Sequence, residues 1–298
     1  MLAEPSVVEL DGAFCRALLP RRDPDGHKGT FGTVVCVAGS LEYAGAGILC
    51  ATSAVRAGAG LVALAVPHWL APVVAGRVPE VVTVPLFGLK SVQDLDPDLA
   101  LASVDERRPD AVVFGPGIAE TAGYHRLLVS LLSETGAPIV VDGGGVNLLA
   151  RAAGWSAPKR QLVLTPHPGE FARLTGAEVP ATDERRLERC VEAARRFGQV
   201  VVLKGARTVV AAPDGRVAVS PFAVAALATA GSGDVLAGLI GALLAQGMGP
   251  FEAACLGVHL HGRAGERLSL RLGDAGVLAS DIAHELPATR HELAQHSQ

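Results

Sequence analysis

The chain has 298 residues, of which 49% are hydrophobic and 19% charged, so it can bury a large core and is not intrinsically disordered. Its formal net charge of −4 offers no basic surface to nucleic acid or to an anionic membrane, and no apolar run approaches a membrane span. The five cysteines are scattered without a CxxC pair, and the N-terminus shows no secretory pattern, which together predict small buried thiols in a cytoplasmic protein.

Short runs of β-branched residues recur along the chain and alternate with longer segments of helical spacing. The runs are continuously apolar, which is typical of strands buried on both faces of a parallel sheet. We expect strands at 33–38, 61–66, 111–114, 138–141, 162–164 and 200–203, and helices at 45–58, 122–135, 168–175 and 182–197. This alternation predicts a three-layer α/β/α fold with a mostly parallel central sheet and right-handed crossovers.

The pattern changes after residue 203. The runs 208–212 and 216–220 are separated by Pro-Asp-Gly and predict a β-hairpin. Three helices are expected next, at 232–246, 250–268 and 276–286, and the polar residues 288–298 are expected to fray. Apolar residues of 232–246 recur at helical spacing, which indicates an amphipathic helix. No linker or repeat interrupts the chain, so residues 1–298 are predicted to form one domain.

Glycine-rich stretches follow several of the predicted strands, at the end where open parallel sheets bind their ligands. AGSLEYAGAG at 38–47 and FGPGI at 114–118 could each be an ordinary turn or a binding surface. Asp142 closes a strand before three glycines, where its spacing favours a helix N-cap over an active-site acid. The dinucleotide fingerprint GxGxxG and the phosphate loop GxxxxGK[ST] are both absent from the sequence.

Two further strand ends carry ionisable residues. His167 stands between two prolines on a stiff loop, and both a substrate contact and a structural hydrogen bond are open to it. Glu170 begins a helix, where an acid is favourable in the helix dipole without any further role. Lys204 suits a phosphate, although a solvated lysine is the commoner occurrence at the end of a strand.

AGSGDVLAG at 230–238 opens a helix with glycines, whose free N–H groups attract an anion. A phosphate bound there would be repelled by Asp234, so an acid at this point needs a reason beyond capping. General-base work on a hydroxyl that attacks a phosphoryl group is such a reason, and simple capping stays open beside it. HLHG at 259–262 predicts no metal site, because residues two apart do not share a helix face.

The order TPHPGE, KGART and ATAGSGDVLAG resembles the ribokinase-like superfamily and, more narrowly, the ADP/ATP-dependent NAD(P)H-hydrate dehydratases. The similarity covers a core of about residues 27–287 and implies a dehydratase domain without the epimerase domain of bifunctional members. His167 stands where sugar kinases of the superfamily carry asparagine, which favours the hydrate-repair branch. VVDGGGVN departs from the family pattern by the loss of an acid, so Asp142 and Asn147 are assigned no role. PFAVAALATA departs from it as well, so the loop over the nucleotide is expected to differ.

The resemblance implies that ADP, or ATP, phosphorylates the C6 hydroxyl of the S-form of hydrated NADH or NADPH, and that elimination of phosphate restores the cofactor. Asp234 would be the catalytic base, and Glu170 would help to position Mg²⁺ through water. The implied hydrate contacts are Ala46, Gly117, His167 and Asp234, and the implied nucleotide contacts are Lys204, Gly205, Ala206, Arg207, Thr208, Gly231, Ser232 and Gly233.

The family also implies a homo-oligomer, with a tetramer favoured, and small molecules rather than nucleic acid or a membrane as partners. One alternative is a ribokinase-like kinase that phosphorylates a small alcohol or a vitamin precursor. Another is a catalytically inactive nucleotide-binding protein, which the intact GSGD, Lys204 and Glu170 disfavour.

Overall fold

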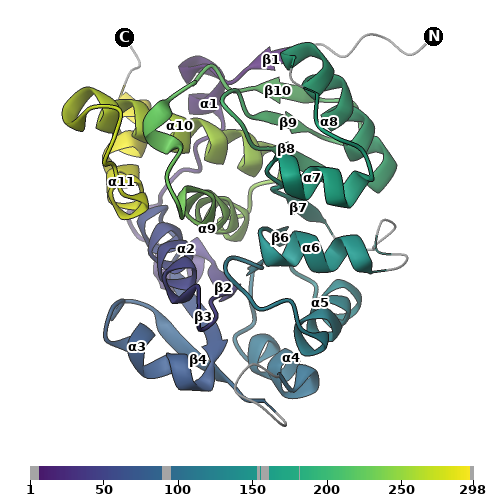
Figure 1. The fold of residues 1–298 in the computed structure, drawn as a ribbon. Coiled ribbons are helices and arrows are strands. Elements are labelled where there is room, and N and C mark those ends of the chain that lie inside the picture. Colours follow the sequence, from purple (N-terminus) through teal and green to yellow (C-terminus); the bar gives the residue numbers. More distant parts are fainter. Residues whose placement is uncertain (1–6, 89–94, 153–154, 156–160, 181, 296–298) are drawn as a thin grey trace.

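The computed structural model describes residues 7–88, 95–152, 155, 161–180 and 182–295. One ten-stranded sheet runs through this part of the chain, in the order β1-β10-β9-β8-β7-β6-β5-β2-β3-β4 (Figure 1). The strands are Val7–Glu9 (β1), Thr33–Val37 (β2), Leu61–Pro67 (β3), Val82–Leu86 (β4), Ala111–Phe114 (β5), Ile139–Val141 (β6), Leu162–Leu164 (β7), Val200–Leu203 (β8), Val209–Ala211 (β9) and Val217–Val219 (β10).

Most of the sheet is parallel. β2 pairs with β3 on one side and with β5 on the other, so that Val35 lies opposite both Ala63 and Val112. The neighbouring strands β4, β3, β2, β5, β6, β7 and β8 all run in one direction, whereas β9 is antiparallel to both β8 and β10. The predicted hairpin is therefore confirmed, as is the mostly parallel sheet.

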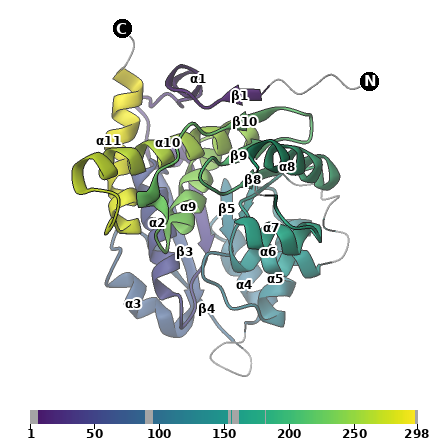
Figure 2. The same ribbon diagram turned by 45° about the horizontal axis from the view of Figure 1, so that its top comes forward.

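Helices cover both faces of the sheet (Figures 1 and 2). One face is covered mainly by α2 (Ala44–Arg56), α9 (Ser232–Ala245), α10 (Pro250–Leu272) and α11 (Ala279–Gln295). The other is covered by α4 (Pro97–Asp105), α5 (Ala122–Glu134), α6 (Gly144–Arg151), α7 (Pro168–Thr175) and α8 (Asp183–Phe197). The short helices α1 (Gly12–Ala17) and α3 (Ala71–Ala75) and the 3₁₀ turns Lys28–Phe31, His68–Leu70 and Ala225–Leu227 complete the described elements.

Two apolar cores lie on opposite faces of the sheet. Because side chains alternate along a strand, Val34 and Cys36 pack with the first group of helices while Val35 and Val37 pack with the second. This two-sided burial explains the continuously apolar strand sequences, and it confirms the three-layer prediction. All five cysteines are free and buried, as the sequence predicted. Among the described helices, none is long and apolar enough to cross a membrane.

Helix α9 differs from the amphipathic helix that the sequence predicted. Every residue from Val235 to Ala245 is buried, so the helix has no solvent-facing side over this length. It packs against β2, β5 and β6 of the sheet and is surrounded by α2, α10 and α11. The prediction was wrong because small residues such as Gly238 and Gly241 fall between the apolar ones, and they face neighbouring elements rather than water.

The C-terminal segment is also more ordered than predicted, because α11 continues to Gln295 instead of fraying after residue 287. Thr289 and Leu293 are buried on the inner side of the helix. The Arg290 guanidinium donates to the carbonyl oxygens of Ala57 (2.8 Å) and Pro20 (3.0 Å). These contacts tie α11 to the end of α2. The last three residues of the predicted frayed segment lie outside the described residues.

An Arg290→Ala variant is expected to lose about 2–3 kcal/mol of unfolding free energy, because two charged hydrogen bonds to partly buried carbonyls are lost. Arg189→Ala is the matched control, since Arg189 on α8 forms an ion pair with the exposed Glu192, and its loss should cost about 0–1 kcal/mol. Urea unfolding measures both values. An equal loss in the two variants would show that α11 contributes little to the fold.

Candidate active site

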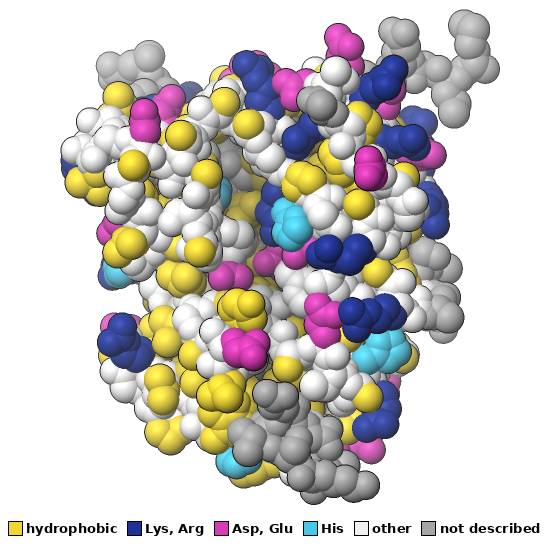
Figure 3. Space-filling view, in the orientation of Figure 1, with side chains coloured by type: hydrophobic (Ala, Val, Ile, Leu, Met, Phe, Trp, Pro, Cys, Tyr) yellow, Lys and Arg dark blue, Asp and Glu magenta, His cyan; other side chains and the backbone are white. Residues whose placement is uncertain are grey.

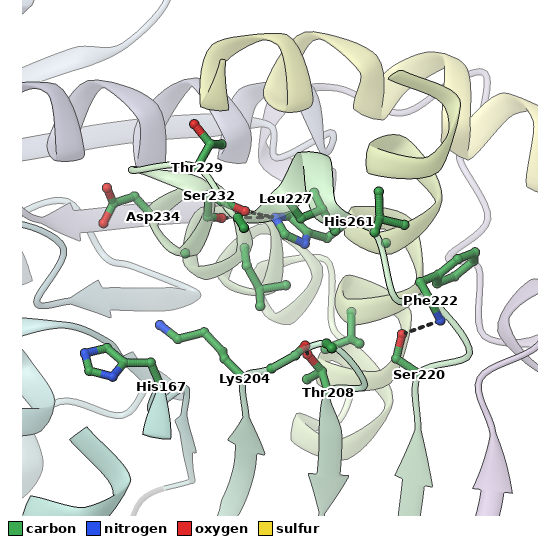
Figure 4. A pocket seen from close by; sticks show the side chains of 18 of the residues that line it. His167, Lys204, Thr208, Ser220, Phe222, Leu227, Thr229, Ser232, Asp234 and His261 are labelled. Atoms are coloured by element: carbon green, nitrogen blue, oxygen red, sulfur yellow. Dashed lines mark hydrogen bonds between the residues drawn. The ribbon is translucent and has the colours of Figure 1, made fainter. Parts of the chain in front are cut away.

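A cavity of about 920 Å³ lies beyond the carboxyl ends of β6, β7 and β8 and faces the start of α9. A hollow opens on this side of the molecule, and basic, acidic and histidine side chains gather along it (Figure 3). In the close view, His167 and Lys204 project from the strand ends toward Ser232 and Asp234 on the helix above them (Figure 4). The cavity therefore lies where an open parallel sheet is expected to bind its ligand.

The glycine turn before α9 places backbone N–H groups at the cavity. Gly231 is the N-cap residue with φ of 89°, a conformation that favours glycine, and a Cβ there would lie 2.5 Å from Cδ1 of Leu49. The N–H groups of Gly233 and Asp234 belong to the first turn, where a helix has no internal acceptor for them. An anion at this end of the cavity would meet these donors and the positive end of the helix dipole.

Asp234 is not the cap of this helix, because the N-cap is Gly231 and no side chain makes a capping hydrogen bond there. Its carboxyl is largely buried in the wall of the cavity. Burial, together with the charges of Asp142 and Glu170, raises the pKa of Asp234 to about 7, against the smaller opposite effect of Lys204. A carboxyl with this pKa can accept a proton near neutral pH, which a simple cap has no need to do.

Lys204 lies at the centre of a cluster of acids rather than in solvent. Its Nζ is 2.7 Å from Oδ1 of Asp142 and 3.9 Å from Oε2 of Glu170. Burial alone would lower the pKa of Lys204, but the two carboxylates outweigh it and raise that pKa. The lysine is thus held as a cation inside the cavity.

Asp142 was predicted to be an N-cap, and the structure contradicts this. The N-cap of α6 is Gly143, with no side-chain capping bond. Oδ1 of Asp142 instead accepts hydrogen bonds from Lys204 Nζ and from Thr165 Oγ1, each at 2.7 Å. The chain turns at Gly143, and this turn directs the Asp142 side chain across the strand ends toward β7 and β8.

His167 and Glu170 form a reciprocal cap at the start of α7. Nδ1 of His167 accepts from the Gly169 N–H at 3.0 Å, and Oε2 of Glu170 accepts from the His167 N–H at 2.8 Å. In neutral His167 the proton is therefore on Nε2, which lies 3.4 Å from Oε1 of Glu170. Burial lowers the pKa of His167 and raises that of Glu170. His167 thus makes a structural hydrogen bond and Glu170 is an acid in the first turn of a helix, as the sequence allowed. Both side chains also line the cavity.

The remaining predicted residues divide into two groups. Gly205, Ala206, Thr208, Gly231, Ser232 and Gly233 line the same cavity. Arg207 does not; its exposed side chain lies 3.9 Å from Asp183 on α8. Ala46 and Gly117 contact each other outside this cavity: Gly117 has φ of 62°, and a Cβ there would lie 2.5 Å from Cβ of Ala46. They adjoin a second cavity of about 400 Å³ lined by Tyr43 and Ile118.

The sequence predicted no site residue in two parts of the cavity, although residues 221–230 were expected to form the loop over the nucleotide. Residues 220–229 line its apolar end with side chains such as Phe222 and Leu227. The apolar composition of this loop, directly before a glycine turn, was the available signal. His261 also lines the cavity, 3.0 Å from Ser232 Oγ. The HLHG sequence drew attention to it only as a metal ligand, and nothing in the sequence placed α10 against the start of α9.

Comparison with known proteins agrees with this geometry. A family model described as NAD(P)H-hydrate dehydratase matches residues 34–288. The ADP-dependent (S)-NAD(P)H-hydrate dehydratase of Neisseria meningitidis is 39% identical over 90% of this chain and 87% of its own length. The bifunctional NAD(P)H-hydrate repair enzyme of Moorella thermoacetica is 42% identical over 96% of this chain. The chain spans about half the length of that and similar bifunctional relatives.

A solved structure is similar over nearly the whole chain. The ADP/ATP-dependent NAD(P)H-hydrate dehydratase of Bacillus subtilis, co-crystallised with ATP and Mg²⁺, superposes with a TM-score of 0.83 at 30% identity. The match covers 97% of this chain and 99% of the other. The predicted ribokinase-like fold is confirmed by this match. On the family model, the identities and the shared fold, the chain belongs to the NAD(P)H-hydrate dehydratase family.

Proposed function

We propose that the chain is an ADP-dependent (S)-NAD(P)H-hydrate dehydratase, which restores NADH or NADPH from the hydrated cofactor. One juxtaposition supports this reading above the others: Asp234, with its pKa near 7, lies on the same helical turn as the N–H groups that suit a phosphoryl group. A hydroxyl and the phosphoryl group that it attacks can meet there. Family membership favours dehydration over the alternative, a kinase of a small alcohol.

The nucleotide is proposed to lie in the larger cavity. Its phosphates would meet the turn Gly231, Ser232 and Gly233, and Lys204 would supply a positive charge beside them. Gly205, Ala206 and Thr208 line the route away from the phosphates, and Arg207 is assigned to the same segment at its exposed edge. The apolar residues of 220–229 would then surround the base.

The hydrated nicotinamide is proposed to reach Asp234 from the side of Ala46, Gly117 and His167. The close contact of Gly117 with Ala46 leaves a surface of backbone there, which lets a flat ring approach. Nε2 of His167 carries the ring hydrogen, since Nδ1 is occupied by the cap of α7, and this hydrogen would be shared between Glu170, 3.4 Å away, and the substrate. Asp234 would accept the proton of the C6 hydroxyl as the hydroxyl oxygen bonds to the terminal phosphorus of ADP, whose bond to the bridging oxygen breaks to release AMP. Loss of the phosphate from C6 and of a proton from the neighbouring ring carbon would then restore the double bond of the ring.

Magnesium fits this site as an ion shared with the nucleotide. Mg²⁺ in such sites is held by substrate phosphates, water and one or two carboxylates, rather than by a protein cage. Among the described residues, no group of three or more His, Cys, Asp or Glu could hold a metal by itself, and the buried carboxylate of Glu170 stands at the cavity. Glu170 would hold the ion through water. When bound, the ion would neutralise phosphate charge.

The proposal is tested with purified protein, ADP, Mg²⁺ and hydrated NADH. Absorbance of the reduced nicotinamide is expected to return, and to do so only when a nucleotide is present. ATP in place of ADP identifies the preferred donor, and hydrated NADPH identifies the preferred cofactor. No recovery with either nucleotide would refute the proposed activity, and phosphorylation of a vitamin precursor by the same protein would establish the kinase instead.

The pH dependence of the reaction follows from the raised pKa of Asp234. A general base acts in its deprotonated form, so kcat/KM should rise with pH and level off above a midpoint near 7. An ordinary aspartate would place this midpoint near 4. Rates measured between pH 5.5 and 9 check the prediction, with the stability of the protein followed over the same range. A rate that falls as pH rises through 7 would argue against Asp234 as the base.

The remaining proposals concern the assembly and its setting. Residues 1–298 are proposed to form one domain with a core over about 27–287, which the continuous sheet supports. A homo-oligomer, with a tetramer favoured, and a cytoplasmic location are proposed on family membership. Light scattering on the purified chain measures the oligomeric state.

A further inference from the structure

His261 lies at the junction between α10 and the glycine turn of α9. Its side chain is buried and lines the cavity next to Ser232, the first residue of α9 (Figure 4). A single ring atom, Nε2, is 3.0 Å from the Ser232 hydroxyl oxygen and 3.0 Å from the Ser232 carbonyl oxygen. The reaction proposed above uses no histidine at this position, so the contact has no role assigned to it.

The carbonyl contact determines where the proton of His261 lies. A carbonyl oxygen only accepts hydrogen bonds, so Nε2 must carry a hydrogen in order to lie 3.0 Å from it. Burial lowers the pKa of His261 to about 4, with a smaller contribution from Lys204, so the ring is neutral at physiological pH. A neutral imidazole has one N–H, and Nδ1 is therefore unprotonated.

This tautomer in turn determines the direction of the serine hydroxyl. The Nε2–H is shared between the two oxygens of Ser232, so the hydroxyl oxygen is an acceptor in this contact. The hydroxyl hydrogen is not used by His261 and is left to donate to another group. Ser232 and Gly233 are the first two residues of α9, and both line the cavity, where Ser232 is buried.

We propose that His261 is a positioning residue for phosphoryl transfer, which holds the Ser232 hydroxyl as a third donor to the transferring group beside the N–H groups of Gly233 and Asp234. This inference rests on the proposed function, because it takes the anion at the turn to be the phosphoryl group. A donor aimed at charge that develops in the transition state lowers the barrier to reaction more than it strengthens nucleotide binding.

A purely structural role for His261 makes a different set of predictions. As a strut between α9 and α10 it would affect stability, and its loss would act independently of the serine hydroxyl. Ser53 offers a matched control, because its Oγ donates to the Val235 carbonyl at 2.6 Å and supports the same turn of α9 from the side away from the cavity. A Ser53→Ala variant removes a buried hydrogen bond and no donor to the ligand.

The experiment measures kcat and KM for ADP in Ser232→Ala, His261→Leu, His261→Gln, the double variant His261→Leu/Ser232→Ala, and Ser53→Ala. His261→Leu should lower kcat by about 10- to 100-fold with little change in KM. Glutamine retains a donor near the Nε2 position and should recover most of that loss. The double variant should be no slower than Ser232→Ala alone, within about threefold, because the two residues act as one unit. Ser53→Ala should keep the kcat of the unaltered protein.

Two outcomes would overturn the inference: losses that multiply in the double variant, or a His261→Leu variant with reduced stability and unchanged kcat. Nitrogen-15 NMR of the labelled protein gives a separate readout. The His261 ring signals, assigned by their loss in His261→Gln, should show a neutral ring protonated at Nε2. The opposite tautomer would refute the positioning role even if dehydratase activity is present. Absence of that activity with the expected tautomer would refute the proposed function instead.

Discussion

Replacing Asp234 by asparagine is expected to lower kcat by about 10²–10⁴-fold while making the folded protein more stable at neutral pH. The amide has nearly the shape of the carboxyl but cannot accept the proton of the substrate hydroxyl. Stopped assays of NADH recovery measure the rate, and urea unfolding measures the stability. Full turnover in this variant would remove Asp234 from the chemistry.

The gain in stability follows from the sign of the pKa shift. The pKa of Asp234 is raised from its ordinary 3.8 to about 7 in the folded protein, so the folded state binds the proton more tightly than the unfolded chain does. Protonation of Asp234 therefore stabilises the folded protein fully below pH 4, and this stabilisation is lost as pH rises through 7. Asparagine carries no charge to bury, so the variant should gain about 1–3 kcal/mol in free energy of unfolding at pH 8. Asp98→Asn, in the first turn of α4, is the control and should change neither kcat nor the free energy of unfolding appreciably.

A Lys204→Met variant is expected to lose about 10²–10³-fold in kcat/KM for ADP. The cation beside the proposed phosphate position is removed, and Asp142, which is 2% exposed, loses its charged partner. The Lys204 charge also lowers the pKa of Asp234, so the midpoint of the pH profile should move to higher pH in the variant. Steady-state kinetics across pH measures both effects. A midpoint that stays in place would show that the two groups are not coupled.

Loss of the lysine will also destabilise the fold, and a second variant separates this from the effect on catalysis. Breaking a buried ion pair on one side costs about 3–5 kcal/mol, whereas removing both partners is close to neutral. Lys204→Met/Asp142→Asn should therefore recover most of the stability and little of the activity. Recovery of activity together with stability would mean that Lys204 serves the fold alone.

The sheet and its main helices could be predicted from the sequence because their signals are local. Continuous apolar runs marked the buried strands, and helical spacing placed α5, α7 and α8 to within a residue or so of their ends. The strand β4 was missed because it carries Pro85, and β1 because only two of its three residues are apolar; both lie at edges of the sheet. The final turns of α11 were missed because contacts with Ala57 and Pro20, far away in the chain, hold them.

Sequence motifs predicted only part of the candidate site. The strand-end positions of His167 and Lys204 followed from the predicted parallel sheet, whereas their meeting with Asp234 was implied by the family resemblance. The pairing of Lys204 with Asp142 could not be predicted. Whether Asp142 caps α6 or pairs across the strands depends on the turn at Gly143. His261 could not be placed either, since its contact with Ser232 joins two helices whose packing no local pattern encodes.

The place of α9 in the chain has a consequence for synthesis on the ribosome. This helix packs against β2, β5, β6 and α2, and the Ser53–Val235 hydrogen bond joins residues 182 positions apart. Of the four main helices on that face, three follow residue 231, so the apolar face stays largely open while the strands are being made. Exposed apolar surface of this kind favours aggregation of nascent chains, and distant contacts slow folding. The protein is therefore expected to complete its fold only after α9, α10 and α11 have been synthesised, and to depend on chaperones until then.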